Sequence, residues 1–329
     1  MKKIKTGVVG YGFSGRIFQC PFVEAHDDYE LAAVVERSSD KSKQDYPNIK
    51  VYKEYADLLN DEEIELVVIS TPNHLHFEQA KLALEANKHV LIEKPFTATY
   101  EEALELTTLA KNKGKIVLPY QNRRFDGDFL TIKKLIADGV KIFEYEAVWD
   151  RFVPEVLGGW QESGIASNNL LFDLGPHFLD QAISLFGEPE EFYKIEHKLR
   201  ENSKIIDHFT MMLTYKDKVV RLKSSMVVAK SDIRYKLHTD HGTYHFYEMG
   251  EQEHQLLAGM RPKDKEYGDN AVYHQYDYDG NKIEHTVIKG NYLMFFSELA
   301  EAIRNGGKPP VTEEEALLII KYLSTNTTL

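Results

Sequence analysis

Short apolar segments alternate with longer amphipathic segments over the first third of the chain. The runs ELVVIS at 65–70 and HVLIEK at 89–94 are largely apolar, which is typical of strands covered by helices on both faces. The segment between them carries its apolar residues at helical spacing. This alternation predicts a doubly wound parallel sheet, and we expect it to occupy a dinucleotide-binding Rossmann domain over residues 1–122.

The pattern changes after residue 122. Segments 214–222, 238–246 and 276–285 each contain two alternating stretches joined by turn residues, which predicts antiparallel hairpins. We therefore expect residues 123–329 to form an α+β domain with a mostly antiparallel open sheet. The polar segment 252–269 reads as a long loop.

The ends of several helices are also marked in the sequence. Thr99 with Glu102, and Thr312 with Glu315, have the spacing of a capping box, and Gly114 is placed to end the first of these helices. In LFDLGPHFLDQ (171–181) we predict a helix that begins near Pro176, with Gly175 at the bend before it. Asp173 then lies just outside the helix and His177 just inside it. The two residues are either a helix cap beside a histidine whose hydrogen bonds are satisfied, or a proton-transfer pair.

Charge and composition narrow the class of protein. The formal net charge of −12 argues against a surface for nucleic acid or anionic membranes, and no run of about 20 apolar residues predicts a membrane span. Cys20 is the only cysteine, so we expect it to be a small buried residue rather than part of a disulfide framework. No spaced set of histidines and carboxylates predicts a metal site. The N-terminus lacks a long apolar segment before its first glycines, and we expect a cytoplasmic protein.

The sequence GYGFSG contains the pattern G-x-G-x-x-G between a predicted strand and a predicted helix. Gly10 permits a tight turn, Gly12 lets the backbone approach a pyrophosphate, and Gly15 allows close packing of helix and strand. In this context the pattern predicts a dinucleotide site, which would include Phe13 and Ser14.

Glu36 ends the second predicted strand, about 20 residues beyond the glycines. A carboxylate at this point accepts hydrogen bonds from the ribose hydroxyls of NAD and repels the 2′-phosphate of NADP. Arg37 follows directly, and a guanidinium there stacks on adenine or pairs with that phosphate. The residues favour NAD and leave NADP open.

Polar residues follow the predicted strands of the parallel sheet. Ligands of such sheets bind at the carboxyl ends of the strands. The residues that we expect at this edge are Thr71, Pro72, Asn73, Glu93, Lys94, Asn122 and Arg123.

Four motifs, GYGFSG, STPNHLH, IEKPF and DLGPH, occur in this order, and together they resemble the Gfo/Idh/MocA oxidoreductase family over essentially the whole chain. YQNRRFDGDFLTIKKLI and WDRFVPEVLGGW are similar to the branch that contains NADP-dependent scyllo-inositol dehydrogenases. Glu36 departs from what we expect of the NADP users in that branch. The resemblance also implies a chain that runs somewhat beyond STNTTL.

The resemblance implies roles for particular residues. Lys94 and His177 would carry the proton transfer, and Asp173 would bind a hydroxyl group or position His177. His76 would lie near the nicotinamide or the ribose, with His74 a weaker candidate, and the open sheet would form a homodimer or homotetramer. Arg123, Arg151 and Trp160 would either contact the substrate or have a structural role, which for Arg151 and Trp160 is to anchor a loop.

The resulting hypothesis is an oxidoreductase that moves a hydride between NAD or NADP and a secondary alcohol of a small sugar, polyol or cyclitol. The alternative from a different class is a dinucleotide-binding sensor or regulatory protein without turnover. A third reading keeps the family and changes the reaction to glycoside chemistry with tightly held NAD.

Overall fold

The computed structural model describes residues 2–156, 158, 162, 167–247, 250–268 and 271–325. The chain divides into two compact units, neither of which is one continuous segment. The first consists of Met1–Asn122, His254–Tyr267 and Asn291–Ile320, and the second of Arg123–Glu253, Gly268–Gly290 and Lys321–Leu329. Two later segments thus join the first unit. The domain boundary expected at residue 122 stays a prediction.

The first unit contains a six-stranded sheet in the order β3-β2-β1-β4-β5-β6, and every pair of neighbouring strands is parallel. This order is that of the doubly wound dinucleotide-binding sheets. The apolar runs of the sequence form its centre, where all four residues of β4 are buried. The strands are β1 (Ile4–Val9), β2 (Tyr29–Val35), β3 (Lys50–Tyr52), β4 (Leu66–Ile69), β5 (His89–Ile92) and β6 (Val117–Pro119).

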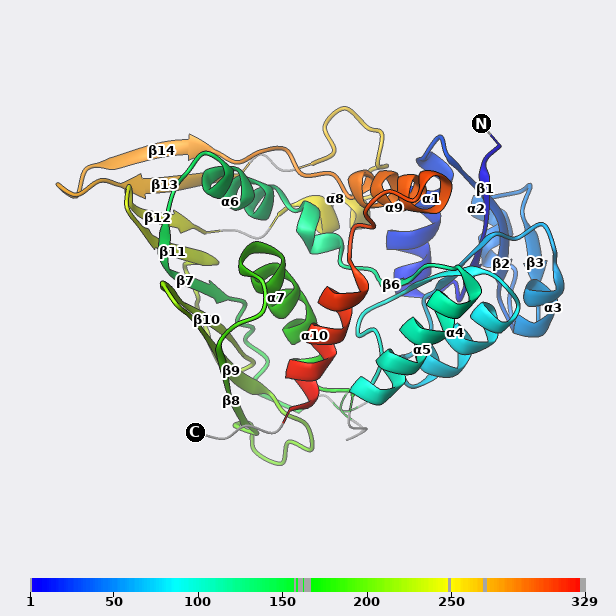
Figure 1. Cartoon of the computed structure of the whole chain (residues 1–329), viewed down its shortest axis with the longest axis horizontal. Helices are drawn as coiled ribbons and strands as arrows, with labels where there is room; N and C mark the ends of the chain where they lie inside the picture. Colours follow the sequence, from blue (N-terminus) through cyan, green and yellow to red (C-terminus); the bar gives the residue numbers. More distant parts are fainter. Residues whose placement is uncertain are drawn as a thin grey trace. The chain divides into compact units, whose positions relative to one another are not determined.

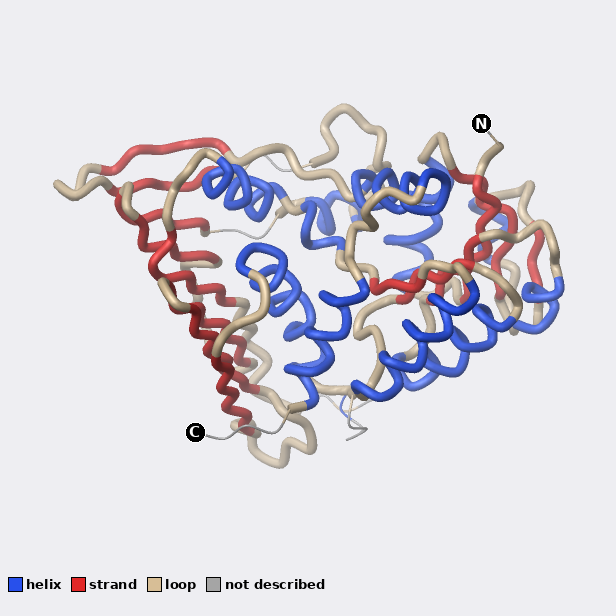
Figure 2. The backbone as a smooth tube through the Cα atoms, viewed as in Figure 1, coloured by secondary structure: helices blue, strands red, loops and turns tan. Residues whose placement is uncertain are grey.

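Helices lie on both sides of this parallel sheet, with α1 and α9 on one side and α4 and α5 on the other (Figure 2). The predicted capping box is present at the start of α5, and Gly114 ends this helix at a φ of 63°. The helices that begin in the first unit are α1 (Cys20–Ala25), α2 (Lys41–Asp45), α3 (Tyr55–Asn60), α4 (His76–Glu85), α5 (Tyr100–Lys113), α9 (Leu293–Asn305) and α10 (Glu313–Ser324).

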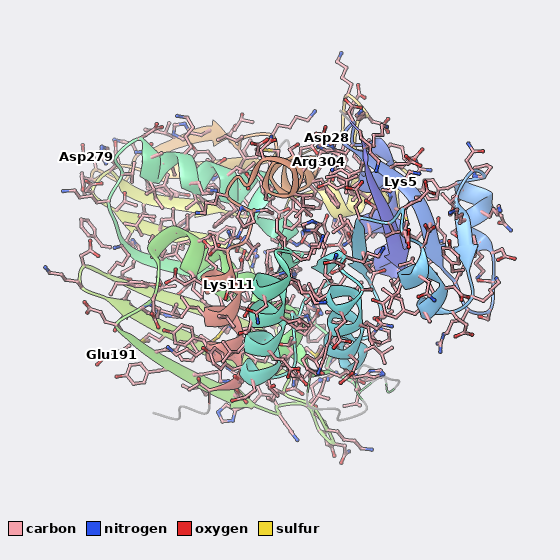
Figure 3. The ribbon with its side chains drawn as sticks, turned by 45° about the vertical axis from the view of Figure 1, so that its right-hand side comes forward. Lys5, Asp28, Lys111, Glu191, Asp279 and Arg304 are labelled. Atoms are coloured by element: carbon pink, nitrogen blue, oxygen red, sulfur yellow. The ribbon has the colours of Figure 1, made fainter. Side chains whose placement is uncertain are left out.

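An aromatic cluster joins α9 to the N-terminal part of the first unit. The ring of Phe22 stacks on that of Phe296 at 5.8 Å, and the ring of Tyr120 meets that of Phe295 edge-on at 4.9 Å. Arg304 near the end of α9 (Figure 3) donates to Glu65 at 3.0 Å. A helix from the last 40 residues therefore completes the core that the first 122 residues begin.

The second unit contains an eight-stranded sheet in the order β14-β13-β12-β11-β7-β10-β9-β8, in which only β7 and β10 pair in parallel. The three predicted hairpins are present as β9–β10, β11–β12 and β13–β14. The predicted fold class is thus confirmed. The strands are β7 (Ile142–Val148), β8 (Glu191–His197), β9 (His208–Tyr215), β10 (Lys218–Ser225), β11 (Tyr235–Thr239), β12 (Gly242–Phe246), β13 (Val272–Tyr276) and β14 (Lys282–Thr286).

One face of this sheet carries the helices α6 (Gly127–Ala137) and α7 (Leu170–Phe186), and no helix of the second unit's described residues covers the other face (Figure 1). Alternation along each strand divides the side chains between the two faces. Tyr145, Leu237 and Val220 are buried on the helix side. A row of paired residues crosses the opposite face and consists of Glu284, His274, His245, Lys236, Glu146, Arg221, Met212 and Tyr193.

The segment expected to be a polar loop from residue 252 begins instead with a short helix, α8 (Gln252–Leu257). Gln252 is fully buried, and its side-chain amide donates to the carbonyl oxygen of Phe125 at 2.9 Å. The prediction was wrong because this helix is fixed by a contact to a residue 127 positions earlier, which no local pattern reports. No helix in the described part of the chain is long and apolar enough to cross a membrane.

Candidate active site

The glycine turn after β1 has the geometry that a dinucleotide requires. Gly10 has a φ of +98°, and its N–H donates to the carbonyl oxygen of Val35 at 3.1 Å, which places the turn beside the end of β2. A Cβ atom on Gly15 would come within 2.1 Å of the Gly10 carbonyl oxygen, whereas a Cβ on Gly12 would meet nothing within 4 Å. Gly10 and Gly15 therefore serve the packing of the turn, and the backbone at Gly12 borders open space. This cradle fits a pyrophosphate group.

Glu93, directly after β5, links the glycine turn after β1 to a strand two positions away in the sheet. Its carboxylate accepts hydrogen bonds from the hydroxyl of Ser14 and, at 2.6 Å, from the side-chain amide of Gln19. Burial raises the pKa of Glu93, while the bonds from Ser14 and Gln19 oppose this shift. Phe13, between the glycines, is 56% exposed and meets the ring of Phe18 edge-on.

His76 connects the ends of β4 and β5. Its ring is fully buried, with Nδ1 at 2.8 Å from the carbonyl oxygen of Pro95 and Nε2 at 2.9 Å from that of Thr71. Burial lowers its pKa, while the contacts with the two carbonyl oxygens oppose this shift. The histidine therefore fixes the turn that contains Lys94 relative to Thr71. Its cofactor role stays a prediction, as do those of Pro72 and Asn73 in the same turn.

Glu36 follows β2 and is 7% exposed. Its Oε1 atom accepts hydrogen bonds from the Ser39 hydroxyl and, at 2.8 Å, from the Lys41 N–H. Its Oε2 atom accepts from the N–H and the hydroxyl of Ser42 at 3.0 and 2.7 Å. Burial alone would raise the pKa of this carboxyl, but the four hydrogen bonds outweigh it and lower the pKa to about 2. Arg37, the next residue, is exposed.

The helix α7 of the second unit carries Asp173 and His177, and it begins earlier than predicted. Asn169 caps it by accepting a hydrogen bond from the Phe172 N–H at 3.1 Å, so Pro176 lies inside the helix and Asp173 lies in its first turn. The expected start near Pro176 was wrong because the side chain of Asn169, seven residues upstream, caps the helix by accepting a hydrogen bond from a free N–H group of its first turn.

Gly175 is a packing position in α7 rather than a bend. A Cβ atom there would lie 2.8 Å from a methyl group of Leu323 and 3.1 Å from one of Leu171. The absence of a side chain lets Leu323 approach the helix backbone closely. Gly175 therefore positions the turn of α7 that lies between Asp173 and His177.

Asp173 forms an ion pair with Arg151. The distance from Nη1 of Arg151 to Oδ2 of Asp173 is 3.0 Å, and the two side chains are 35% and 42% exposed. The backbone of Arg151 is fixed by a hydrogen bond from its N–H to the carbonyl oxygen of Ser225 at 2.8 Å. His177, one turn after Asp173, is 5% exposed. Both sequence candidates thus lie on one turn of a well-anchored helix.

Trp149, at the end of β7, is the centre of this group and was not selected from the sequence. Its ring stacks against that of His177, with centroids 6.3 Å apart and planes 27° apart. The guanidinium carbons of Arg123, Arg151 and Arg234 lie 5.0, 5.7 and 4.9 Å from the Trp149 ring. The one available signal was the position of Trp149 two residues before Arg151 in WDRFVPEVLGGW.

Arg123 is 4% exposed and lies between two carboxylates, those of Glu253 in α8 and Asp126. Its neighbour Asn122 is also buried. Such burial suits a residue that supports the ring of Trp149. The substrate contact of Arg123 stays a prediction. Trp160 lies outside the described residues.

The predicted residues thus form two groups, each within its own unit. In the first unit the glycine turn, Glu36, Thr71, His76, Glu93 and Lys94 follow neighbouring strand ends. In the second unit Arg123, Arg151 and His177 pack against Trp149, and Asp173 pairs with Arg151. Among the described residues no three histidine, cysteine, aspartate or glutamate side chains are grouped as metal ligands would be.

Comparisons with known proteins assign the class. Residues 4–121 match the oxidoreductase family with an NAD-binding Rossmann fold, Gfo/Idh/MocA, and residues 133–325 match its C-terminal alpha/beta domain. The chain belongs to the Gfo/Idh/MocA oxidoreductase family, and the resemblance noted in the sequence is confirmed. Its cofactor is accordingly NAD or NADP.

Individual relatives cover almost the whole chain. The uncharacterized oxidoreductase YdgJ of Escherichia coli is 36% identical over 97% of this chain and 94% of its own length. The scyllo-inositol 2-dehydrogenase (NADP(+)) IolW of Bacillus subtilis is 35% identical over 97% of this chain and 92% of its own. The solved structure of an oxidoreductase from Bacillus cereus is 31% identical, with a TM-score of 0.87 over 98% of this chain and 95% of that one.

Proposed function

We propose that the protein is an NAD(P)-dependent dehydrogenase that acts on a secondary alcohol of a sugar, polyol or inositol. The observation that carries this proposal is the pair of Asp173 and His177 on one turn of α7, in a chain whose first unit is an NAD-binding Rossmann domain. The relative IolW, a scyllo-inositol 2-dehydrogenase, supports a small polyhydroxylated substrate.

Oxidation of a secondary alcohol requires a base for the hydroxyl proton, while the nicotinamide ring supplies the hydride acceptor. In this proposal His177 accepts the proton at its imidazole, since its ring is held in place by the stack on Trp149. Lys94 supplies a positive charge that stabilises the developing alkoxide. Asp173, oriented by Arg151, binds a neighbouring hydroxyl group.

The remaining residues have proposed roles in binding the substrate or the cofactor. Arg123, Arg151 and Trp160 contribute to the substrate site. A small molecule is the proposed partner, with no nucleic acid, and the cytoplasmic location remains a prediction. The proposed cofactor contacts are Gly10, Gly12, Phe13, Ser14, Gly15, Glu36, Arg37, Thr71, Pro72, Asn73, His76, Glu93, Lys94 and Asn122.

We also propose that the uncovered face of the eight-stranded sheet joins subunits into a homodimer or homotetramer. Support comes from the row across this face, in which Met212 and Tyr193 stand beside paired charges such as Arg221 and Glu146 at 2.8 Å. Such a mixture of apolar and internally neutralised side chains suits contact with an identical face. Light scattering on the purified chain tests this, and a monomeric mass would contradict it.

The deciding experiment for the activity tests NAD⁺ and NADP⁺ against inositols, aldoses and sugar acids, in wild type and Lys94→Ala. We expect turnover on at least one polyol and a loss of at least 100-fold in kcat for the variant, because the alkoxide loses its cationic partner. Lys111→Ala, which removes one exposed positive charge from α5 (Figure 3), is the matched control and should keep full activity.

Two results would count against the proposal. Full turnover in Lys94→Ala would remove Lys94 from the chemistry. Binding of nucleotide without turnover on any member of the panel would favour the sensor or regulatory protein instead.

A further inference from the structure

A buried lysine in the second unit has no part in the proposed mechanism. Lys194 in β8 has a side chain that is 4% exposed, and its Nζ atom lies 2.6 Å from Oε1 of Glu196. Nζ also donates a hydrogen bond to the carbonyl oxygen of Leu323 at 2.6 Å. Burial of an ammonium group costs free energy unless the charge is paired and its donors are bound. Glu196 supplies the opposite charge, and Leu323 links the lysine to a helix.

Leu323 lies in the last turn of α10, in the part of this helix that belongs to the second unit. The last four carbonyl groups of a helix lack partners within it, and this end of the helix carries a partial negative charge. Lys194 supplies both a donor and a positive charge there. The ring of Tyr322 also packs against that of Phe192, with centroids 4.6 Å apart. Two residues of β8 therefore hold the last turn of α10.

The side chain of Leu323 reaches the helix α7. Leu323 is 1% exposed, and a Cβ atom on Gly175 would lie 2.8 Å from one of its methyl groups. This distance is shorter than a van der Waals contact between carbon atoms, so there is no room for a side chain at Gly175. Gly175 lies between Asp173 and His177. The position of Leu323 therefore limits where that turn of α7 can lie.

Lys321, in the same turn of α10, offers a comparison. Its Nζ atom pairs with Glu188 at 2.9 Å, and both side chains are 49% exposed. A half-exposed pair of this kind contributes little to stability. The bond of Lys321 goes to a side chain and not to the carbonyl group at the end of the helix. Lys321→Ala is therefore the matched control for a change at Lys194.

We propose that Lys194 is a positioning residue of the active site. It acts through Leu323, whose side chain supports the turn of α7 between Asp173 and His177. The inference rests on the proposed function and adds to it a residue that acts without contacting the substrate. It also gives the last turn of α10 a part in activity.

The first test separates positioning from folding. Lys194→Met keeps a long flexible side chain but removes the charge and the donor. We expect kcat/KM on the polyol found in the panel to fall about 10- to 100-fold, mainly in kcat, because small misplacements of catalytic groups are costly. The Kd for NADH or NADPH, measured by isothermal titration calorimetry, should not change, because the first unit is unaltered. Lys321→Ala should change neither quantity.

The second test follows the route from Leu323 to α7. The methyl group of Gly175→Ala needs the space that Leu323 occupies, so kcat/KM should fall about 10-fold or more. Leu323→Ala makes room for this methyl group, and the double variant should recover about threefold or more of the loss. Both variants keep Lys194 in place, so this test stands even if Lys194→Met does not fold.

Amide hydrogen exchange of the full chain provides a measurement that does not depend on turnover. Mass spectrometry follows the peptides that cover residues 171–180. In Lys194→Met we expect them to exchange about 10-fold faster than in wild type, because the turn of α7 loses its support and opens more often. In Lys321→Ala their exchange should equal that of wild type.

The outcomes separate the inference from the proposed function. Unchanged exchange in Lys194→Met would overturn the inference and leave the dehydrogenase proposal intact. A loss of nucleotide binding as large as the loss of activity would indicate general unfolding, and a double variant no more active than Gly175→Ala would exclude the route through Leu323. Either result would likewise overturn the inference. Absence of turnover in wild type would contradict the dehydrogenase proposal, and hydrogen exchange would still decide whether Lys194 supports α7.

Discussion

The helix α7 carries two aspartates, each paired with an arginine, and the two pairs differ sharply in their surroundings. Asp180 accepts from Nε and Nη2 of Arg124 at 2.7 to 3.0 Å, and both side chains are almost fully buried. Asp173, two turns earlier, accepts from Nη1 of Arg151 at 3.0 Å, and both of these side chains are more than one third exposed.

The two pairs show that the exposure of an Asp–Arg pair distinguishes a pair that stabilises the fold from one that is available to a ligand. A buried, bidentate pair fixes the position of a helix, because the loss of either charge leaves the other in a medium of low polarity. A half-exposed pair contributes little to stability and can exchange its partner for a ligand. The buried pair is suited to holding α7 in place, and the exposed pair is the one that we propose for the substrate site.

The largest effect that we expect comes from the buried pair. Asp180→Asn takes the negative charge away from the buried guanidinium of Arg124, and we expect it to lower the free energy of unfolding by about 3 to 5 kcal/mol. Urea denaturation of the whole chain measures this. Replacing both residues with apolar ones, Arg124→Met with Asp180→Leu, should recover part of the loss, and no recovery would show that the pair acts through something besides its charge.

The exposed pair should show the reverse pattern. Asp173→Asn is expected to lower kcat/KM about 100-fold, equivalent to about 2.7 kcal/mol, while the free energy of unfolding changes by less than about 1 kcal/mol. Steady-state kinetics on the substrate found in the panel and urea denaturation measure the two quantities. An unfolding loss as large as that of Asp180→Asn would erase the distinction between the pairs.

Glu36 provides a third case, a buried carboxylate that is held by hydrogen bonds and has no arginine partner. Its folded pKa of about 2 lies below the ordinary value of 4.5, so its contribution to stability is present above about pH 4.5 and is lost as the pH falls toward 2. We expect Glu36→Gln to cost about 2 kcal/mol at pH 7, and the difference from wild type to shrink by about 1 kcal/mol at pH 3.5. A difference that stays constant between these pH values in urea denaturation would show that the charge of Glu36 is not what stabilises residues 36–42.

Local rules predicted much of the fold. The hairpins and both capping boxes depend on residues a few positions apart, and the bonds between Thr312 and Glu315, at 2.8 and 3.2 Å, are present as expected. The start of α7 was missed because two local signals competed, and the amide of Asn169 outweighed the preference of Pro176 for a first turn. Segment 252–257 was missed because its helix depends on tertiary contacts.

The site was predictable only in part, for a related reason. Motifs located Lys94, Asp173 and His177, because each lies in a short segment of distinctive sequence. The contacts that hold the surrounding residues Arg123 and Trp149 in place come from elsewhere in the chain. Glu253 pairs with Arg123 across 130 positions, and Arg234 reaches the ring of Trp149 from β11's N-terminal end. The satisfaction of Glu36 by serine hydroxyls was local, yet it depends on backbone angles that the sequence does not display.

The late arrival of α9 has a consequence for the nascent chain on the ribosome. Phe22 and Tyr120 are made early, but Phe296 and Phe295, which cover them, follow about 275 and about 175 residues later, respectively. At a translation rate of about 5 to 20 residues per second, these apolar rings wait about 10 to 55 seconds for their partners. During that interval the emerging first unit presents an incomplete core, and its early aromatic side chains are exposed to water.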